Sequence, residues 1–462
     1  MFPMERSISS SADARGKNEV NADDQISKLS NDLLLKILST LSMEEIVRTS
    51  VLSKRWVDVW KETSSLFLDM RRLPKVTSPP SNVTLDAKSV TKVIKDHRGH
   101  LESCTICHNS RQCEDGVVEN WIQLLIHQKH IKQLSLESYL EPARKPTRIT
   151  LNLPPESLSH PNLKSLSLGS YAFNAPHAFN NCRNLKRLKL DGILAEVEVF
   201  NEILASCSSL EALTLDITSF EGSGFLEIGN PKLQFLDLSC SKIDGVEVST
   251  HSLDILSIRS LSCAFENFII ANPRFQQFSR NFWATGHCYP HTIYDITCSH
   301  QEKKSIGHEL MTSGSGYLMQ SGASLSVSVN MTNTKEVEML KEVFAAWPNP
   351  LAEIEIVFKN NKLPMEEGES SIGRTRKKFW ENTRQLANAG LHAYRVWLVN
   401  LSGSQEEFEL ASHLITQGMV FRHMMIIPLS SCSPSKKLEI ETVVAKLKKL
   451  PKRHKELDIE IW

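Results

Sequence analysis

Residues 160–168 read HPNLKSLSL and residues 230–238 read NPKLQFLDL, and both contain the pattern L-x-x-L-x-L. Six copies of this pattern occur between residues 131 and 258, with Ile in place of Leu at the first and last positions. After a first, longer interval, successive copies begin 22, 25, 23 and 20 residues apart. Units of about 20–29 residues with this pattern form one short strand each. Because no unit can bury its own leucines, the sequence predicts a stack of strands that share one core.

The same pattern predicts which side chains are free to bind. Side chains alternate along a strand, so the leucines of L-x-L point into the core and the residue between them points to the opposite face. We expect a binding surface on that face or in the loops at its carboxyl end. The candidate residues from geometry alone are Ser165, Ser167, Arg187, Lys189, Thr214, Asp237 and Arg259. We also expect Asp191, Asp216 and Asp237 to be solvated or to form turns, because their spacing follows the repeat.

Residues 24–64 predict three short helices. Asn31 and Asp32 are expected to cap the first helix, whose apolar residues form a wide face. Ser42-Met-Glu-Glu45 is a capping box for the second, and Ser53-Lys-Arg-Trp56 begins the third. About forty residues make a small core, so part of this apolar surface is expected to need a partner.

The stretch DQISKLSNDLLLKILSTLSMEEIVRTSVLSKRWVDVW at residues 24–60 resembles the F-box of plant F-box/leucine-rich-repeat proteins, and TSVLSKRW at 49–56 is its most specific part. Ser30 and Ser42 stand where the family usually has Pro. Serine caps helices, so we expect the fold to survive both changes. Their effect on the affinity for the adaptor protein is left to be tested. The residues expected to form the adaptor contact or the F-box core are Leu29, Leu33, Ile37, Leu38, Leu41, Val51, Trp56 and Trp60.

The resemblance implies the fold class and the function. The fold implied is an α/β solenoid, with a three-helix F-box followed by a leucine-rich-repeat horseshoe. The function implied is substrate recognition in an SCF-type ubiquitin ligase, by a non-catalytic chain without a cofactor. Such a chain binds a Skp-type adaptor and, through it, a cullin and a RING protein. It also holds a target protein, whose identity is unknown. Two alternatives are a hormone-type receptor for a small molecule and an interaction scaffold outside ubiquitination.

Beyond residue 260 the pattern weakens, and Pro273-Arg-Phe275-x-x-Phe278 is interpreted as a degenerate copy. GMVFRHMMII at 418–427 is similar to the C-terminal (FBD-like) region of many such F-box proteins. Strands are predicted at 325–329, 354–358, 394–399, 424–427 and 457–461, and helices at 335–347 and 377–389. The predicted divisions are a disordered tail (1–22), the F-box (23–66), a linker and repeat cap (67–130), repeats (131–280), an irregular insertion (281–322) and degenerate repeats (323–462). Within the cap we expect a strand at 103–108 and a helix at 117–127.

Composition restricts the partners. The chain has 53 Lys and Arg against 53 Asp and Glu, which gives no reason to expect nucleic acid or an anionic membrane as the main partner. The polar N-terminus does not resemble a signal peptide, and no stretch approaches the roughly 20 apolar residues of a membrane helix. Its ten cysteines are therefore expected to be reduced thiols in the nucleus or cytoplasm.

Two groups of Cys and His residues were weighed as metal sites, and neither has standard zinc spacing. Cys104-x-x-Cys107 lies close to His97, His100, His108 and Cys113. If residues 103–108 form a strand, the two cysteines face opposite sides and one of them is a core residue. The other group is His287, Cys288, His291, Cys298 and His300. We expect no metal at either.

The remaining motifs do not favour catalysis. G-x-S-x-G, P-loop, G-x-G-x-x-G and H-E-x-x-H motifs are not found. The run KLKKLPKRHK at 446–455 is interpreted as the solvated face of the last helix, with a nuclear import signal or a phosphate-contacting patch as the alternatives.

Overall fold

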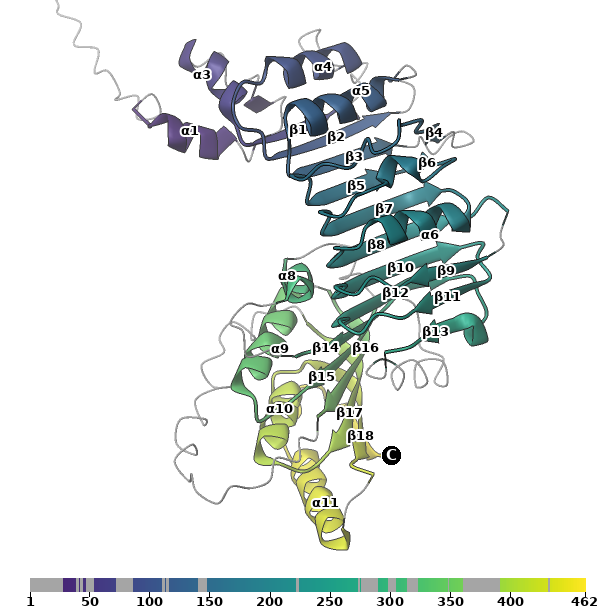
Figure 1. Cartoon of the computed structure of the whole chain (residues 1–462). Helices are drawn as coiled ribbons and strands as arrows, with labels where there is room; N and C mark the ends of the chain where they lie inside the picture. The colour runs from purple at the N-terminus through teal and green to yellow at the C-terminus, as the bar shows by residue number, and fades with distance from the viewer. Residues whose placement is uncertain are drawn as a thin grey trace, which may run out of the picture.

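The computed structural model describes residues 28–38, 41, 45–46, 54–71, 86–109, 113, 116–139, 148–221, 224–272, 275, 290–297, 305–313, 323–347, 349–359, 391–430 and 433–462. The described chain is elongated, with its N-terminal helices at one end and its last helix at the other (Figure 1). The predicted tail, Ser42, most of the second helix, Phe278 and the helix at 377–389 lie outside these residues. Among the described helices, none is long and apolar enough to cross a membrane.

One mixed sheet runs along the molecule and, among the described residues, contains sixteen strands. The six copies of the leucine pattern form neighbouring parallel strands, which confirms the prediction of one strand per copy. These strands are β3 (Gln133–Tyr139), β5 (Ser165–Gly169), β7 (Arg187–Leu194), β8 (Ala212–Thr218), β10 (Phe235–Ser241) and β12 (Ile255–Leu261). The short strands β4 (Ile149–Thr150) and β6 (Tyr171–Ala172) extend the sheet beside β7.

The sheet begins upstream of the leucine pattern, with β1 (Ser65–Asp69) and β2 (Ser103–Asn109). Cys104 and Ile106 of β2 occupy the register positions of Leu134 and Leu136 in β3, so other apolar residues replace the leucines. Helices α4 (Ala87–Asp96) and α5 (Val117–Gln123) cover this end, and α5 continues as a π-helix, η3 (Leu124–Gln128). The strand at 103–108 and the helix at 117–127 are confirmed, whereas β1 and α4 were not foreseen.

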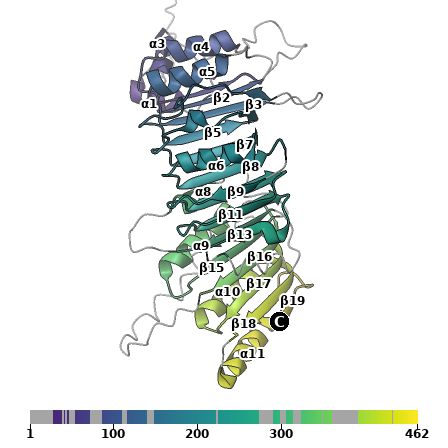
Figure 2. The ribbon, with the colours of Figure 1, turned by 45° about the vertical axis from the view of Figure 1, so that its right-hand side comes forward.

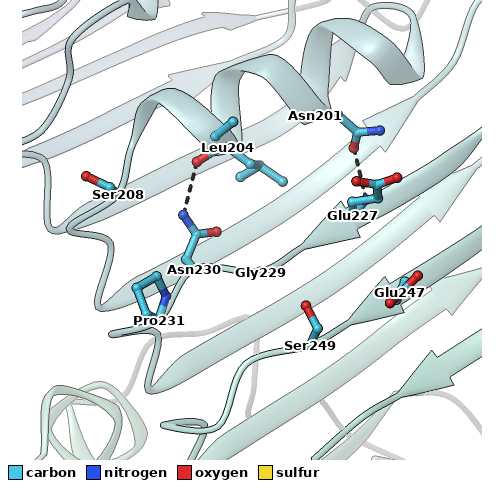
Figure 3. A pocket seen from close by; sticks show the side chains of 10 residues that line it. Asn201, Leu204, Ser208, Glu227, Gly229, Asn230, Pro231, Glu247 and Ser249 are labelled. Atoms are coloured by element: carbon cyan, nitrogen blue, oxygen red, sulfur yellow. Dashed lines mark hydrogen bonds between the residues drawn. The ribbon is translucent and has the colours of Figure 1, made fainter.

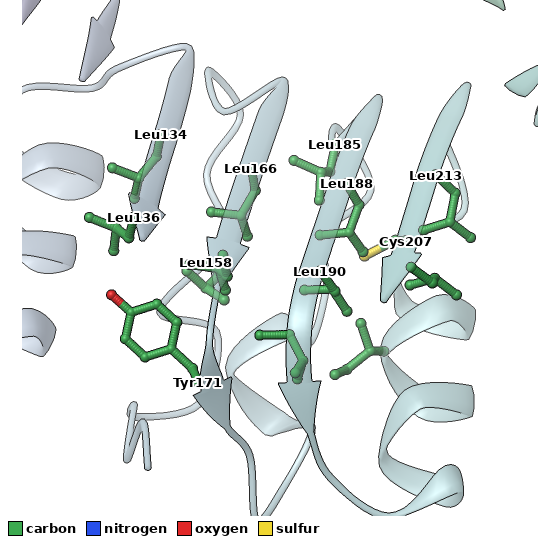
Figure 4. Packing of buried hydrophobic residues seen from close by; sticks show 14 of the residues in the cluster. Leu134, Leu136, Leu158, Leu166, Tyr171, Leu185, Leu188, Leu190, Cys207 and Leu213 are labelled. Atoms are coloured by element: carbon green, nitrogen blue, oxygen red, sulfur yellow. The ribbon is translucent and has the colours of Figure 1, made fainter. Parts of the chain in front are cut away.

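The leucines of successive strands form one continuous core on the inner face of this part of the sheet (Figure 4). Leu166, Leu188, Leu213 and Leu236 are all buried there. The core is covered by α6 (Val197–Ser206), the short helices η4 (His177–Phe179) and η5 (Phe265–Asn267), and a second sheet of β9 (Phe225–Ile228), β11 (Gly245–Val248) and β13 (Phe268–Ile270). Each repeat therefore buries its leucines against a helix or a short strand of its own and against its neighbours.

The direction of the strands reverses once, at β14 (His291–Asp295), which pairs antiparallel with β12. The strands that follow run parallel to β14: β15 (Ser324–Val329), β16 (Leu351–Phe358), β17 (Ala393–Leu401), β18 (Val420–Pro428) and β19 (Asp458–Ile461). All five strands predicted beyond residue 320 are confirmed. The expectation of an irregular segment at 281–322 is wrong where it covers β14 and α8 (Ile306–Thr312). Every residue of β14 is buried, so no alternation revealed it.

This reversal moves the core to the other face of the sheet. Ile255 pairs with Tyr294, which pairs with Val327, and all three belong to a second apolar core. Their neighbours in sequence, Leu256 and Ile293, belong to the first core on the opposite face. The crossover connection between two parallel strands is right-handed. Here the strands reverse direction while the sheet keeps growing on the same side. Right-handed connections then place the helices on the opposite face of the sheet. Figure 1 shows α8 at the left, next to α9, and α6 at the right.

Helices α9 (Thr334–Ala346), α10 (Gln405–Thr416) and α11 (Pro434–Lys448) cover the second core together with α8 (Figure 2). The helix predicted at 335–347 is confirmed as α9. Polar side chains cap all three helices, because their first N–H groups have no partner within the helix. The caps are Asn333, Ser404 and Ser433, and Ser404 forms a full capping box with Glu407.

The N-terminal helices α1 (Asn31–Leu38), α3 (Lys54–Val59) and η1 (Trp60–Glu62) pack together at the first edge of the sheet. Ser30 caps α1, since its hydroxyl accepts from Leu33 N at 3.4 Å. The expectation that Asn31 and Asp32 supply this cap is wrong, because both already lie in the first turn.

Backbone contacts join these helices firmly to the sheet. Arg98 N and Gly99 N both donate to Lys61 O, at 2.7 and 2.9 Å. A hydrogen bond of 2.7 Å joins the buried His97 ring to Thr63 O. A Cβ on Gly99 would lie 2.6 Å from Glu62 Cα, so only glycine permits this approach. The orientation of the N-terminal helices is therefore set by main-chain packing.

We predict that Gly99→Ala loosens this junction. The added methyl group meets backbone, which cannot rotate away, and overpacking of this kind costs about 1–3 kcal/mol. Urea unfolding should show a lower midpoint for this variant. His100→Ala, at an exposed neighbouring position, is the control and should leave the midpoint unchanged. Equal midpoints for Gly99→Ala and the wild type would contradict the proposed close packing.

Candidate interaction surfaces

The first candidate surface is the outer face of α1. Leu34 and Leu38 are fully buried against the rest of the protein, whereas Leu33 is 49% exposed and Ile37 is 42% exposed. Leu33 and Ile37 are four residues apart, so they lie on one face of the helix, one turn apart. Two adjacent large apolar side chains on a short helix form a surface that gains free energy when a partner covers it.

The other residues predicted at this end divide between the core and the surface. Trp56 is buried, and Leu29, Leu41 and Trp60 are partly buried and pack against the same core. Val51 lies outside the described residues. Leu34 was missed as a core residue, although its spacing of four residues from Leu38 was a signal for it. Thus Leu38 and Trp56 support the fold, and Leu33 and Ile37 are the residues available to a partner.

The second candidate surface is the outer face of strands β1 to β12, opposite the leucine core. We call it the open face. Small and hydroxyl residues occupy its middle, where Ser165 and Ser167 of β5 lie in register with Arg187 and Lys189 of β7. Thr214 of β8 follows Lys189 in register, and all five side chains are partly buried. These five predicted residues are therefore brought together on one continuous surface.

The basic side chains on the open face are paired with acids. Lys189 Nζ lies 3.0 Å from Asp191, and Arg187 lies 3.8 Å from Glu309 of α8. Helix α8 covers the β12 end of this face, where a Cβ on Gly307 would meet Ile255. The sequence pattern did not show that a helix from the second half of the chain limits the open face, because α8 lies in the segment predicted to be irregular.

The remaining two predicted residues, Asp237 and Arg259, form an ion pair in which Asp237 is buried and Arg259 is partly buried. Arg259 Nε donates to both carboxylate oxygens of Asp237 at 3.1 Å, and Arg259 also lies 3.3 Å from Asp216. Asp237 is 1% exposed, so the expectation that it is solvated is wrong. Burial raises the pKa of Asp237, and the positive charge of Arg259 opposes that rise. Asp237 is thus a structural residue of the face, not a free ligand for a target.

The Cys and His residues near the first edge form a buried hydrogen-bonded chain. The His108 ring lies 2.6 Å from the Tyr171 hydroxyl and 3.5 Å from the Cys113 thiol. Burial lowers the pKa of His108 to about 4 and raises that of Cys113 to about 12. The thiol and the imidazole are therefore both neutral near pH 7, which does not favour a thiolate nucleophile.

The Cys-x-x-Cys pair is divided between two faces as predicted. Cys104 belongs to the leucine core, and the Cys107 thiol faces Glu137 at 3.6 Å on the other side. Burial raises the pKa of both to about 12. His97 bonds Thr63 elsewhere, and His100 is exposed beside Glu102. Among the described residues, no group of three or more His, Cys, Asp or Glu is placed to hold a metal ion.

Of the second Cys and His group, only His291 is described, and its ring bonds the Ser326 hydroxyl at 3.0 Å. Its other members, His287, Cys288, Cys298 and His300, lie outside the described residues. The basic run at 446–455 begins in the last turn of α11, which ends at Lys448. Leu447 is buried while its lysine neighbours are exposed, as expected for a solvated helix face.

Comparisons with known proteins match both the N-terminal helices and the leucine repeats. Residues 26–68 match the F-box domain, and residues 118–275 match the leucine-rich repeats of the FBD-associated F-box protein At5g56370. F-box protein At1g80960 of Arabidopsis thaliana is 44% identical over 92% of this chain and 88% of its own length. F-box protein At3g60790 of the same plant is 41% identical over 98% and 93%. F-box/FBD/LRR-repeat protein At1g80470 is 27% identical over 55% and 54%.

We predict that Arg259→Met destabilises the protein strongly. It leaves the buried Asp237 carboxylate without its positively charged partner, and breaking a buried pair in this way costs about 3–5 kcal/mol. Urea unfolding measures the loss, and the double variant Asp237→Leu with Arg259→Met should recover most of it. Lys189→Met removes the more exposed pair with Asp191 and should cost at most about 1 kcal/mol. Similar losses for Arg259→Met and Lys189→Met would contradict the structural role of Asp237.

Proposed function

The chain belongs to the family of plant F-box proteins with leucine-rich repeats, and on that premise we propose that it is the substrate-recognition subunit of a Skp–cullin–F-box ubiquitin ligase. F-box proteins generally act as substrate receptors of such complexes, and members with leucine-rich repeats are typically non-catalytic adaptors. The observation that carries the proposal is the exposed pair Leu33 and Ile37 on α1, inside the segment that matches the F-box domain.

The proposed adaptor interface is an apolar helix face packed against partner helices. Leu33 and Ile37 project from a helix whose other face, Leu34 and Leu38, is anchored in the core. A helix that is fixed before binding loses little conformational entropy on binding, so burial of its outer face adds to affinity. Ser30, in place of the usual proline, keeps the start of this helix capped.

At the other end, we propose that the repeats bind a target protein on the open face, the concave side of the proposed horseshoe. Ser165, Ser167, Arg187, Lys189 and Thr214 are the contact residues of this proposal, which is supported by their shared surface. Asp237 and Arg259 are placed as its structural support. Paired Arg and Lys side chains favour a protein target over a small anionic hormone, because the pairs already satisfy the cations.

The close packing of Lys61 against Gly99 fixes the position of the N-terminal helices relative to the sheet. The sheet begins directly after η1, so a target on the repeats lies at a fixed distance from the adaptor. The chain would then promote ubiquitin transfer by raising the local concentration of target lysines near the cullin-bound enzymes, without supplying a catalytic group. We also propose that the protein works in the nucleus or cytoplasm, supported by its unpaired cysteines among the described residues.

We predict that replacing Leu33 and Ile37 by Asp together abolishes binding to a Skp-type adaptor. The two charges enter the apolar interface without a partner, yet the substituted positions are exposed in the free chain, so its fold is retained. Co-purification with the adaptor measures binding, and circular dichroism checks the fold. Leu438→Asp on α11, 65% exposed, is the matched control and should bind normally.

Retained adaptor binding in the Leu33 and Ile37 variant would count against the proposal. Leu38→Asp is a poor test by comparison, although Leu38 is among the residues that the sequence predicts for the adaptor contact or the F-box core. Leu38 is fully buried, so a charge there unfolds the helix and any loss of binding becomes uninformative.

A further inference from the structure

On the face of the sheet opposite the open face, α6 and the strands β9 and β11 border a groove of about 440 Å³ (Figure 3). We call it the α6 groove. Its walls include Glu227 of β9 and Glu247 of β11, and Asn230 lies at its base. Leu204 and Ala205 of α6 and Pro231 add apolar surface. The groove lies on the covering layer of the repeats, away from both surfaces described above.

Two carboxylates lie side by side in this groove. Glu227 and Glu247 are directly in register on neighbouring parallel strands, and both are exposed. In the part of the chain that the structure describes, no hydrogen bond or ion pair reaches either carboxylate. Like charges placed directly opposite on neighbouring strands destabilise a sheet. The presence of two carboxylates that repel each other is explained if both bind a cation.

Asn230 points to the same conclusion independently. It is 5% exposed, and its amide nitrogen donates to Leu204 O at 3.0 Å and to Cys207 O at 3.1 Å at the end of α6. Because carbonyls only accept, these bonds fix the amide orientation. The amide oxygen is buried and has no hydrogen-bond partner among the described residues. Figure 3 shows it turned away from α6, on the groove side. A buried acceptor without a donor is unusual, and a bound water, an ion or a donor group of a ligand is what normally satisfies it.

The electrostatic surroundings also favour a cation. The C-terminal end of α6, with its partial negative charge, lies beside the groove. Residues 196–250 contain ten acidic and two basic residues. The edge of β9 is already occupied, because the Asn201 amide donates to Phe225 O and accepts from Glu227 N, both within 2.9 Å. A partner would therefore enter with a side chain and would not add a strand to β9.

We propose that the α6 groove binds the cationic side chain of an arginine or lysine from a partner protein. Such a side chain carries donors only at its head, and the two carboxylates and the Asn230 oxygen are all acceptors. Its hydrocarbon stem fits against Leu204, Ala205 and Pro231. A bare calcium ion fits less well, because it takes six to eight oxygen ligands. The site lies beyond the proposed adaptor and target surfaces and does not depend on either.

The experiment is fluorescence anisotropy with the full-length chain and a labelled tetra-arginine peptide at low salt. The wild type should bind it, and a tetra-citrulline peptide of the same length should not bind. Glu227→Gln with Glu247→Gln should weaken binding at least about tenfold, which corresponds to about 1.4 kcal/mol. Glu221→Gln with Glu266→Gln removes the same charge from exposed positions outside the groove and should change affinity by less than about twofold.

Three results would overturn the proposal. Equal weakening in both double variants would show that the peptide senses only the overall acidity. Unchanged binding in Glu227→Gln with Glu247→Gln would remove the carboxylates from the interaction. Displacement of the peptide by calcium chloride, but not by magnesium chloride, would assign the carboxylates to a divalent cation.

A stability measurement separates binding from a structural role. Replacing both carboxylates by amides relieves their repulsion, so the thermal midpoint of Glu227→Gln with Glu247→Gln should equal or exceed that of the wild type. A lower midpoint would show that the carboxylates support the fold, which contradicts the inference that they are kept for a ligand.

Discussion

Each L-x-L strand carries two leucines that it cannot bury alone, and lateral pairing with the next strand is what removes them from water. This constraint joins the described strands from β1 to β19 into one long sheet, apart from β9, β11 and β13, which form the second sheet over the leucine core. It also explains why the N-terminal helices are held rigidly. The strand that follows them, β1, is the first member of the stack, and backbone hydrogen bonds from Arg98 and Gly99 to Lys61 join η1 to the segment that leads into β2. Adaptor binding and target binding are thereby proposed to lie on one rigid body.

The reversal at β14 gives the molecule two different halves. Before β14 the polar face of the sheet is open and the leucine face is covered; after it, helices α8 to α11 cover the face that continues from the open one. The open face therefore ends where α8 crosses it, at Ile255 and Gly307. A target bound there would contact the strands from β1 to β10, and α8 would form the far wall of its site.

Local patterns in the sequence predicted most of the strands. The leucine repeat located six strands and their inward faces, the spacing of apolar residues located α1, and α9 and the strands beyond residue 320 were also predicted. The sequence did not reveal β14, because a strand buried on both faces has no alternation, nor the ion pair of Asp237 and Arg259, whose members lie in different repeats. The α6 groove was also missed. Its residues come from three separate segments, and the in-register placement of Glu227 and Glu247 depends on a second sheet.

Hydrogen–deuterium exchange of the full chain, with and without a Skp-type adaptor, tests most directly whether the two ends have separate roles. We expect the adaptor to slow exchange in residues around α1 and α3, while the repeat strands β5 to β12 exchange as in the free protein. Protection spread over the repeat strands, or no protection at the N-terminal helices, would contradict the claim that one end of the sheet holds the adaptor and leaves the open face free.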